Sequence, residues 1–265
     1  MYHFYEEILN MKKNVLNVCF IFVFLLGCFS CTHEDVSIYA SYGVLQNVTS
    51  ENNYEILTDR GNILVVTESN TIREVEEGKR VLANYEILSD KNQAKNIYEV
   101  KVNGFYNLLS KPLVNESFIL DNEDARRDSI GNDPFIQIRG DFGGDYINID
   151  FEVYFQYGST TRHLINLIYD DTNVESDTIR LTLRHNAYGE TLAQSYNLIS
   201  GWGRCSFKIA DLLPEGITTM PVILTWEQYE HHGYGSKERS ATKTFQLRSD
   251  SPSRFERFDS TINLQ

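Results

Sequence analysis

The stretch Ile147-Asn148-Ile149-Asp150-Phe151-Glu152-Val153-Tyr154-Phe155 decides the fold of this chain. Every odd-numbered residue in it is apolar, and the even-numbered residues are mostly polar. Because successive side chains of a β-strand point to opposite faces, this alternation predicts a strand with one buried and one solvent-facing side. Residues 179–184 and 205–209 repeat the pattern. We therefore expect a sheet protein in this half of the chain.

Turn sequences separate these predicted strands at short intervals. Residues 222–226 form a more continuously apolar run, which predicts a strand buried on both faces, and Phe245 and Leu247 mark a last strand. The glycine-rich and Asn-rich turn candidates are residues 140–144, 157–159, 186–189 and 200–203. About seven short strands at this spacing predict an antiparallel β-sandwich, which we place at residues 135–248.

The preceding part of the chain predicts a second, smaller β-domain. Five apolar runs follow one another at residues 39–48, 54–57, 63–66, 81–88 and 97–102. Arg60-Gly61-Asn62 is typical of a hairpin turn, and no run is long enough to be a covering helix. The fold class we expect is therefore all-β, with a small five-stranded OB-like barrel at residues 38–111 followed by the β-sandwich.

The remaining segments are expected to connect or extend these domains. Residues 112–134 are predicted to be a linker, which contains the one helical-turn candidate of the chain at residues 122–127. Residues 249–265 are rich in Ser, Asp and Arg, and we expect them to form a mobile C-terminal tail.

The N-terminus has the features of an export signal. Met11-Lys12-Lys13 is a short basic head, and the uncharged apolar run that follows is too short to span a bilayer. We expect a signal peptide at residues 1–30. Residues 1–10, which place Glu6 and Glu7 ahead of the basic head, are interpreted as a mis-called gene start.

Two cysteines at the end of this signal are candidates for lipidation. Cys31 is followed at once by a polar acidic run and is the preferred site, whereas Cys28 follows the better apolar box and is the alternative. Residues 31–37 would then form a lipidated tether that anchors the protein in a membrane through acyl chains such as palmitate. An ordinary signal peptide with two incidental cysteines is the remaining interpretation.

Composition limits the classes of partner. The net charge is −13, from 24 basic and 37 acidic residues, and such a surface repels the phosphate backbone of nucleic acids. After removal of the signal and lipidation of Cys31, only Cys205 remains, so no disulfide framework is expected. Cys205 alternates with apolar residues, which predicts a buried, unreactive thiol.

Residues that could carry chemistry are few and scattered, and we predict no catalytic site, metal site or cofactor. Acids that are neighbours in sequence rarely face each other across a cleft, as glycoside hydrolysis requires. Adjacent histidines point to opposite faces of a strand, so they rarely bind one metal ion together. The candidates considered are the His231-His232 pair, the Asp170-Asp171 pair, Asp141, Asp145 and Asp150 as calcium ligands, and His163 and His185.

Aromatic residues on predicted polar faces are the better indication of binding. Tyr146 and Tyr154 fall on the solvent-facing side of the deciding strand, and Trp202 lies between two glycines. Such aromatics often contact sugars or proteins, so we take these three residues as candidate ligand contacts. A barrel packed against the sandwich would bury the same residues, and this alternative stays open.

Several strings of residues resemble the NigD-like lipoproteins of the Bacteroides and Prevotella group. They are Gly78-Lys79-Arg80-Val81-Leu82-Ala83-Asn84-Tyr85-Glu86-Ile87-Leu88-Ser89-Asp90, Val100-Lys101-Val102-Asn103, Asp128-Ser129-Ile130-Gly131-Asn132-Asp133-Pro134, His163-Leu164-Ile165-Asn166-Leu167 and Leu183-Arg184-His185-Asn186. The resemblance implies an OB-type domain, a C-terminal β-sandwich and a lipid anchor. It implies no catalytic residues.

Three functions are compatible with these observations. We favour a non-catalytic binding module that recognises an envelope protein or a glycan. The alternatives are a bacteriocin-immunity protein, which rests on the family resemblance, and a glycan-active hydrolase. Glu34 and Asp35, directly after Cys31, resemble the surface-export signal of lipoproteins in this bacterial group. We therefore expect an outer-membrane lipoprotein that faces outward.

Overall fold

The structure is a computed structural model that describes residues 37–51, 53–71, 74–121, 129–173, 177–230, 235–246 and 257–259. The predicted signal peptide, Cys28, Cys31, Glu34 and Asp35 lie outside these residues, as do His231-His232 and the helical-turn candidate at 122–127. Among the described residues, no helix is long and apolar enough to cross a bilayer.

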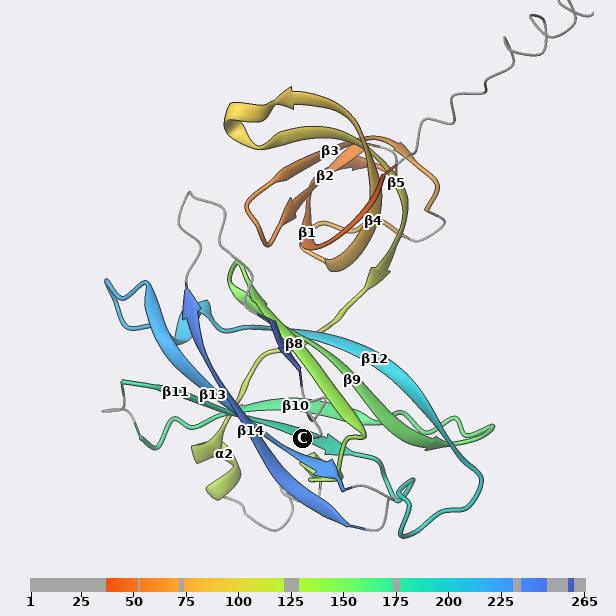
Figure 1. The fold of residues 1–265 in the computed structure, drawn as a ribbon, viewed down its shortest axis with the longest axis vertical. Helices are drawn as coiled ribbons and strands as arrows, with labels where there is room; N and C mark the ends of the chain where they lie inside the picture. The colour runs from red at the N-terminus through yellow and green to blue at the C-terminus, as the bar shows by residue number, and fades with distance from the viewer. Residues whose placement is uncertain are drawn as a thin grey trace, which may run out of the picture. The chain divides into compact units, whose positions relative to one another are not determined.

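Residues 38–107 form a closed five-stranded barrel (Figure 1). The strands lie in the order β1-β2-β3-β5-β4, and β1 closes the ring by pairing with β4. β3 runs parallel to β5, while the other neighbours are antiparallel. This arrangement confirms the OB-like barrel. The strands are β1 (Ile38–Ser50), β2 (Asn53–Thr58), β3 (Ile63–Ser69), β4 (Arg80–Asn92) and β5 (Ile97–Asn107), with the 3-10 helix η1 (Gln93–Lys95) before β5.

The barrel interior follows from alternation along each strand. Tyr54 and Ile56 of β2, Leu64 and Val66 of β3, and Val100 of β5 are all buried, and the residues between them are more exposed. The predicted Arg60-Gly61-Asn62 turn is confirmed, because β2 and β3 pair antiparallel on either side of it. Burial of these side chains stabilises the barrel by about 1.5–3 kcal/mol each.

The second part of the chain is a sandwich of two five-stranded sheets (Figure 1). One sheet has the order β14-β13-β11-β10-β7 and the other β15-β8-β9-β12-β6. The sandwich is confirmed, but its sheets are mixed and not purely antiparallel, because β11 runs parallel to β13 and the short β6 and β7 run parallel to their neighbours. The deciding stretch of the sequence lies in β9 and alternates as expected, with Ile147, Ile149, Phe151 and Val153 buried. The principal strands are β8 (Gln137–Gly143), β9 (Tyr146–Gln156), β10 (Leu164–Tyr169), β11 (Ile179–Asn186), β12 (Leu198–Lys208), β13 (Thr219–Tyr229) and β14 (Ser236–Gln246), with the 3-10 helix η2 (Ala210–Leu212) between β12 and β13.

The sandwich core contains the free thiol that the sequence predicts to be buried. Cys205 packs there with Phe207, and burial raises the pKa of its thiol well above the ordinary range. The prediction that residues 222–226 are buried on both faces is wrong. Val222, Leu224 and Trp226 are buried, but the residues between them are half-exposed, so β13 has one buried face rather than two.

One predicted turn is wrong. Residues 200–203 lie inside β12, where Gly201 and Gly203 pair with β9. The rings of Phe155 and Phe151 lie over these two glycines, so closely that a Cβ would come within 2.6 and 2.3 Å of ring carbons. The glycines therefore make room for aromatic side chains of the neighbouring strand instead of turning the chain. Similarly, β8 continues through Gly143, and the turn before β9 is confined to Gly144 and Asp145.

The expected linker belongs to the sandwich. β6 (Leu109–Ser110) pairs with β12, and β7 (Val114–Asn115) pairs with β10 and leads into the short helix α2 (Glu116–Leu120). The sandwich therefore begins at β6, before the boundary that the sequence predicts. At the other end, β15 (Arg257–Asp259) pairs with β8, so part of the expected mobile tail is a sheet strand.

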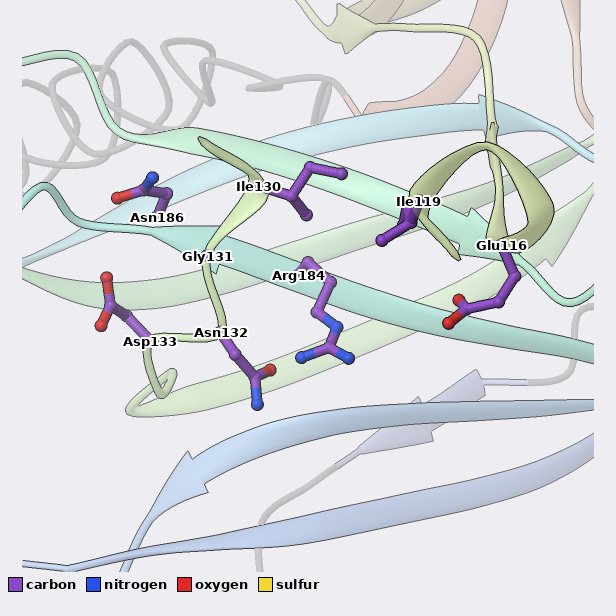
Figure 2. Close-up of a pocket in the computed structure, with 8 residues that line it drawn as sticks. All are labelled: Glu116, Ile119, Ile130, Gly131, Asn132, Asp133, Arg184 and Asn186. Carbon is purple, nitrogen blue, oxygen red and sulfur yellow. The ribbon is translucent and has the colours of Figure 1, made fainter. Parts of the chain in front are cut away.

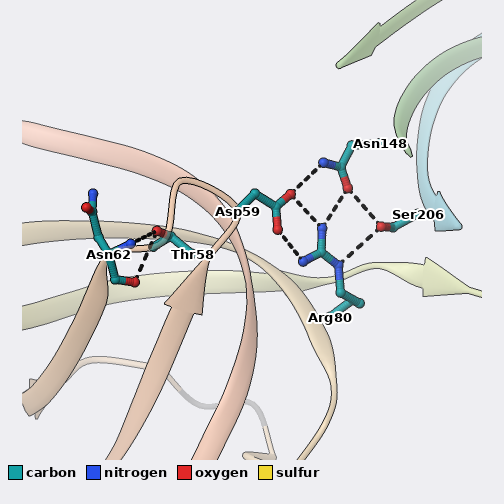
Figure 3. A network of polar contacts seen from close by, with 6 residues as sticks. All are labelled: Thr58, Asp59, Asn62, Arg80, Asn148 and Ser206. Atoms are coloured by element: carbon teal, nitrogen blue, oxygen red, sulfur yellow. Dashed lines mark hydrogen bonds and ion pairs between the residues drawn. The ribbon is translucent and has the colours of Figure 1, made fainter. Parts of the chain in front are cut away.

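A buried polar network, here called the Arg80 joint, connects the barrel to the sandwich (Figure 3). Arg80 of β4 forms two bonds with the carboxylate of Asp59, at 2.6 and 2.9 Å. It also donates to Asn148 Oδ1 of β9 at 2.7 Å and to Ser206 Oγ of β12 at 3.2 Å. Asn148 Nδ2 in turn donates to Asp59 Oδ2 at 2.7 Å. All four residues are at most 3% exposed. Hydrogen bonds join Arg80 and Asp59 of the barrel to Asn148 and Ser206 of the sandwich.

Candidate ligand pocket

A pocket of about 440 Å³ lies on the sandwich where β11, α2 and the segment before β8 come together (Figure 2). Its volume falls in the range of small-molecule sites. β11 contributes a cation and an amide, α2 contributes an acid and an apolar side chain, and the segment before β8 contributes the rest. The lining residues are Glu116, Ile119, Ile130, Gly131, Asn132, Asp133, Arg184 and Asn186.

One wall is residues 129–133, here called the strap, which is bound along the end of β11. The Asp133 N–H donates to the carbonyl of His185 at 2.8 Å, and the Asp133 carboxylate accepts the N–H of Ala187 at 2.7 Å. At the other end of the strap, Asn186 Nδ2 donates to the carbonyl of Ser129 at 3.0 Å. These bonds satisfy backbone groups of both segments and hold the pocket wall in one position.

Gly131 allows the strap to lie this close. Its φ angle is +72°, a conformation that residues with a Cβ rarely adopt. A Cβ at this position would also lie 2.7 Å from the carbonyl oxygen of His185 and 2.7 Å from the Cβ of Asn186. Both the backbone angle and the space therefore require glycine here.

The opposite wall is α2, and Asp171 fixes its start. The Ser117 N–H donates to Asp171 Oδ1 at 2.8 Å, and the Ser117 hydroxyl lies 2.5 Å from Oδ2. Burial alone would raise the pKa of Asp171, but these hydrogen bonds outweigh burial and lower it. Asp170 instead binds the N–H and hydroxyl of Thr172. Asp170 and Asp171 thus stabilise separate turns and do not form an acid–base pair.

The two charged side chains Arg184 and Glu116 of the lining form no hydrogen bond or ion pair within the described part of the fold. Figure 2 shows the Arg184 guanidinium extending between Asn132 and Glu116. Arg184 and Glu116 are half-buried, and among the described residues neither side chain has a hydrogen-bond or ion-pair partner. The pocket therefore presents five guanidinium donors, an amide and a carboxylate acceptor to whatever enters.

A buried relay of three titratable residues lies close to the strap. Glu190 Oε2 is 3.3 Å from His163 Nε2, and His163 Nδ1 is 3.0 Å from His185 Nε2. Burial, together with the neighbouring His163, lowers the pKa of His185 to about 3. Burial would raise the pKa of Glu190, but hydrogen bonds led by the Ser159 hydroxyl lower it to about 2. Because the His185 carbonyl holds Asp133, this relay supports the strap.

The pocket is suited to binding and offers little chemistry. Its lining contains no hydroxyl, thiol, imidazole or amine group that could act as a nucleophile. The carboxylate of Asp133 already accepts a backbone N–H. Within the described part of the chain, no group of three His, Cys, Asp or Glu residues is arranged to hold a metal ion.

The predicted aromatic contacts do not lie in this pocket and do not lie together. The Arg80 guanidinium stacks on the ring of Tyr146 at 3.9 Å, so Tyr146 belongs to the Arg80 joint. Tyr154 packs edge-on against Tyr229 at 5.3 Å. Trp202 is 48% exposed on the outer face of β12, 5.1 Å from the Arg139 guanidinium. Tyr146 therefore agrees with the alternative interpretation, in which the barrel packs against this side chain.

The three calcium candidates also have separate roles. Asp150 accepts the hydroxyl of Tyr42 at 3.1 Å and pairs with Arg204 at 3.0 Å. The Asp145 carbonyl accepts the N–H of Ile209 in the turn before β9. Asp141 lies within β8. The structure therefore uses these residues in turns and in strand contacts.

Reasoning from local motifs missed Arg184, Glu116 and the strap, because the pocket is assembled from segments distant in the chain. The sequence nevertheless contains an indication of this pocket. Residues 129–134 and 183–186, which belong to two of the strings that carry the family resemblance, lie against each other in the folded chain and form most of the pocket.

Residues 117–239 match the family of the NigD-like C-terminal beta sandwich domain. The matched segment begins in α2 and ends in β14, and it contains the strap, β11 and the relay. The match confirms the resemblance for the sandwich. No protein with a curated description matches the sequence.

Solved structures from Parabacteroides and Bacteroides species have a similar fold. A protein from Parabacteroides distasonis, provisionally named as toxin-related, is 25% identical with a TM-score of 0.55, covering 79% of this chain and 94% of its own. A NigD-like immunity protein from Bacteroides caccae is 15% identical with a TM-score of 0.57, covering 77% and 92%. A provisionally named lipoprotein from Bacteroides fragilis is 12% identical with a TM-score of 0.53, covering 80% and 99%.

Proposed function

We propose that the protein acts as a non-catalytic binding module of the cell envelope whose recognition site is the Arg184 pocket. The match of residues 117–239 to the NigD-like C-terminal beta sandwich domain supports this proposal. One observation carries the proposal: a half-buried guanidinium without a partner among the described residues projects into a pocket whose two walls are fixed by hydrogen bonds. Holding such walls in place before a ligand arrives lowers the entropic cost of binding.

The composition of the pocket favours binding over catalysis. Its lining supplies hydrogen-bond donors, acceptors and two isoleucines, but no nucleophile with an adjacent base. The relay of Glu190, His163 and His185 contains groups typical of acid–base chemistry, yet His185 is 2% exposed and none of the three lines the pocket. An absence of turnover with glycan and peptide substrates is the expected result.

The envelope location is supported by the sequence before residue 37. We propose a lipoprotein anchored through Cys31 in the outer membrane and facing outward, with Glu34 and Asp35 in the export signal. Labelling cells with a palmitate analogue tests the anchor. Cys31→Ala should abolish the label, and Cys28→Ala should leave it. Proteinase added to intact cells should degrade the protein if it faces outward, and protection would place it on the periplasmic side.

The binding function is tested by capture in the native envelope. The full, tagged chain is cross-linked in cells, and the material captured by wild type is compared with that captured by Arg184→Gln. Arg180→Gln is the matched control, because Arg180 lies on the same strand and face, is exposed, and does not line the pocket. Partners lost with Arg184→Gln and retained with Arg180→Gln support the proposal. Identical capture by all three proteins contradicts it.

A protective role against a toxin is the second candidate. The fold is shared with the NigD-like immunity protein of Bacteroides caccae, and the likeness in sequence is low. Deleting the gene should sensitise the cell to one toxin of neighbouring strains, and complementation should restore resistance. Unchanged sensitivity to a panel of neighbouring toxin producers would remove this candidate.

A further inference from the structure

From the groups that remain unused in the pocket, we infer that its ligand is the carboxyl-terminal end of a peptide, with an aliphatic side chain and a free carboxylate. This inference rests on the proposed function of the pocket and names the chemical class that it recognises. The carboxylate binds Arg184, the preceding amide N–H faces Glu116, and the aliphatic group lies against Ile119 and Ile130.

Arg184 determines the charged part of the ligand. It is the one cation in the lining, and no described residue neutralises it. A guanidinium presents its N–H groups in a flat fork that fits the two oxygens of a carboxylate. Because Arg184 is half-buried, a bound carboxylate would be partly shielded from water, which strengthens the ion pair.

Glu116 narrows the choice of anion. Its carboxylate lines the same pocket as the Arg184 guanidinium and repels a dense, doubly charged group such as phosphate. A monoanion that carries an N–H donor beside it can satisfy both residues. The end of a peptide has this arrangement, since the last amide N–H is one carbon from the carboxylate.

The apolar wall distinguishes a peptide from an acidic sugar. Figure 2 shows the side chains of Ile119 and Ile130 turned toward each other above the polar groups, and Ile119 is 5% exposed. Sugars usually stack on the flat face of an aromatic ring, and the described lining contains no aromatic residue. Branched aliphatic side chains instead pack well against another aliphatic group.

The test is an NMR titration of the folded protein with small probes. N-acetyl-L-leucine should bind with a Kd of about a few millimolar, as expected for a ligand of this size. N-acetyl-L-leucinamide, which lacks the carboxylate, should bind about tenfold more weakly, as should N-acetyl-L-leucine to Arg184→Gln. Arg180→Gln should change the Kd by less than about twofold. Arg184→Lys keeps the charge without the fork and should give an intermediate Kd.

Other probes provide the outcomes that overturn the inference. Tighter binding of glucuronate than of N-acetyl-L-leucine would assign the pocket to acidic sugars. If wild type binds phosphate as tightly as N-acetyl-L-leucine, the pocket is a general anion site. Phosphate binding that is gained only in Glu116→Gln supports the role given to Glu116. Binding of no probe, with Arg184-dependent capture intact in cells, would remove the ligand class and leave the proposed function standing. Loss of both probe binding and Arg184-dependent capture would contradict the ligand class and the proposed function together.

Discussion

Two arginines of this protein, Arg80 and Arg184, have opposite environments. Arg80 lies in the joint between barrel and sandwich, where Asp59, Asn148 and Ser206 occupy its guanidinium. Arg184 projects into a pocket, and no described residue occupies its guanidinium. A closed network fixes two domains, and an open one is available to a ligand. Whether the guanidinium has partners, rather than its burial alone, distinguishes the structural Arg80 from Arg184, which is free to bind a ligand.

The joint supplies the largest expected effect. Arg80→Met leaves the carboxylate of Asp59 buried without its cation, which should lower the free energy of unfolding by about 3–5 kcal/mol. Urea unfolding monitored in both domains measures this, and the barrel and the sandwich should then unfold in separate transitions. The double variant Arg80→Met/Asp59→Leu removes both charges and should recover most of the loss. A loss below about 1 kcal/mol in Arg80→Met would contradict the structural role of the joint.

The strap supplies the next effect and connects stability to the pocket. Gly131→Ala should lose about 3 kcal/mol, because a left-handed alanine and a crowded Cβ both cost free energy. Gly158→Ala is the control, since Gly158 also has positive φ (+79°) but has open space around its Cβ position. It should lose only about 1–2 kcal/mol. Equal losses in the two variants would show that the strap does not lie tightly on β11.

The relay predicts a loss of stability in acid. The pKa of His185 is about 3 in the folded chain and 6.5 when unfolded, so the unfolded chain binds more protons between these values. The stability from neutral His185 is complete above pH 6.5 and falls by up to ~1.4 kcal/mol per pH unit below it. This amounts to about 2 kcal/mol at pH 5. Glu190, whose pKa falls from 4.5 to about 2, adds a further loss below pH 4.5.

A variant without the imidazole measures the contribution of His185 to this pH dependence of stability. His185→Phe keeps a ring beside Phe135, whose centroid is 5.1 Å from that of His185, but cannot take up a proton. Thermal unfolding measured from pH 7 to pH 5 should give a flatter dependence in this variant than in wild type. An unchanged slope would assign the acid sensitivity to other groups.

The strands of this protein can be predicted from its sequence, whereas contacts between distant segments cannot. Alternation along residues 147–155 identifies the strand and its buried face correctly, because burial of one face needs only local periodicity. The role of Gly201 and Gly203 is hidden, since the rings that cover them come from another strand. The alternation places Tyr146 on the polar side of β9, but its contact with Arg80 depends on how the barrel packs. The pocket is missed for the same reason, since α2, the strap and β11 meet only in the folded chain.

Arg184→Gln should have the smallest effect on stability, and this result distinguishes Arg184 from Arg80. Arg184→Gln should change the free energy of unfolding by less than about 0.5 kcal/mol, because the guanidinium has no described partner to lose. The same urea experiment as for Arg80→Met measures it, with Arg180→Gln as control. A neutral change in stability together with lost capture in the envelope is the behaviour of a binding residue. A loss approaching that of Arg80→Met would mean that Arg184 is held by a partner in solution, and the pocket would then be part of the scaffold, as the joint is.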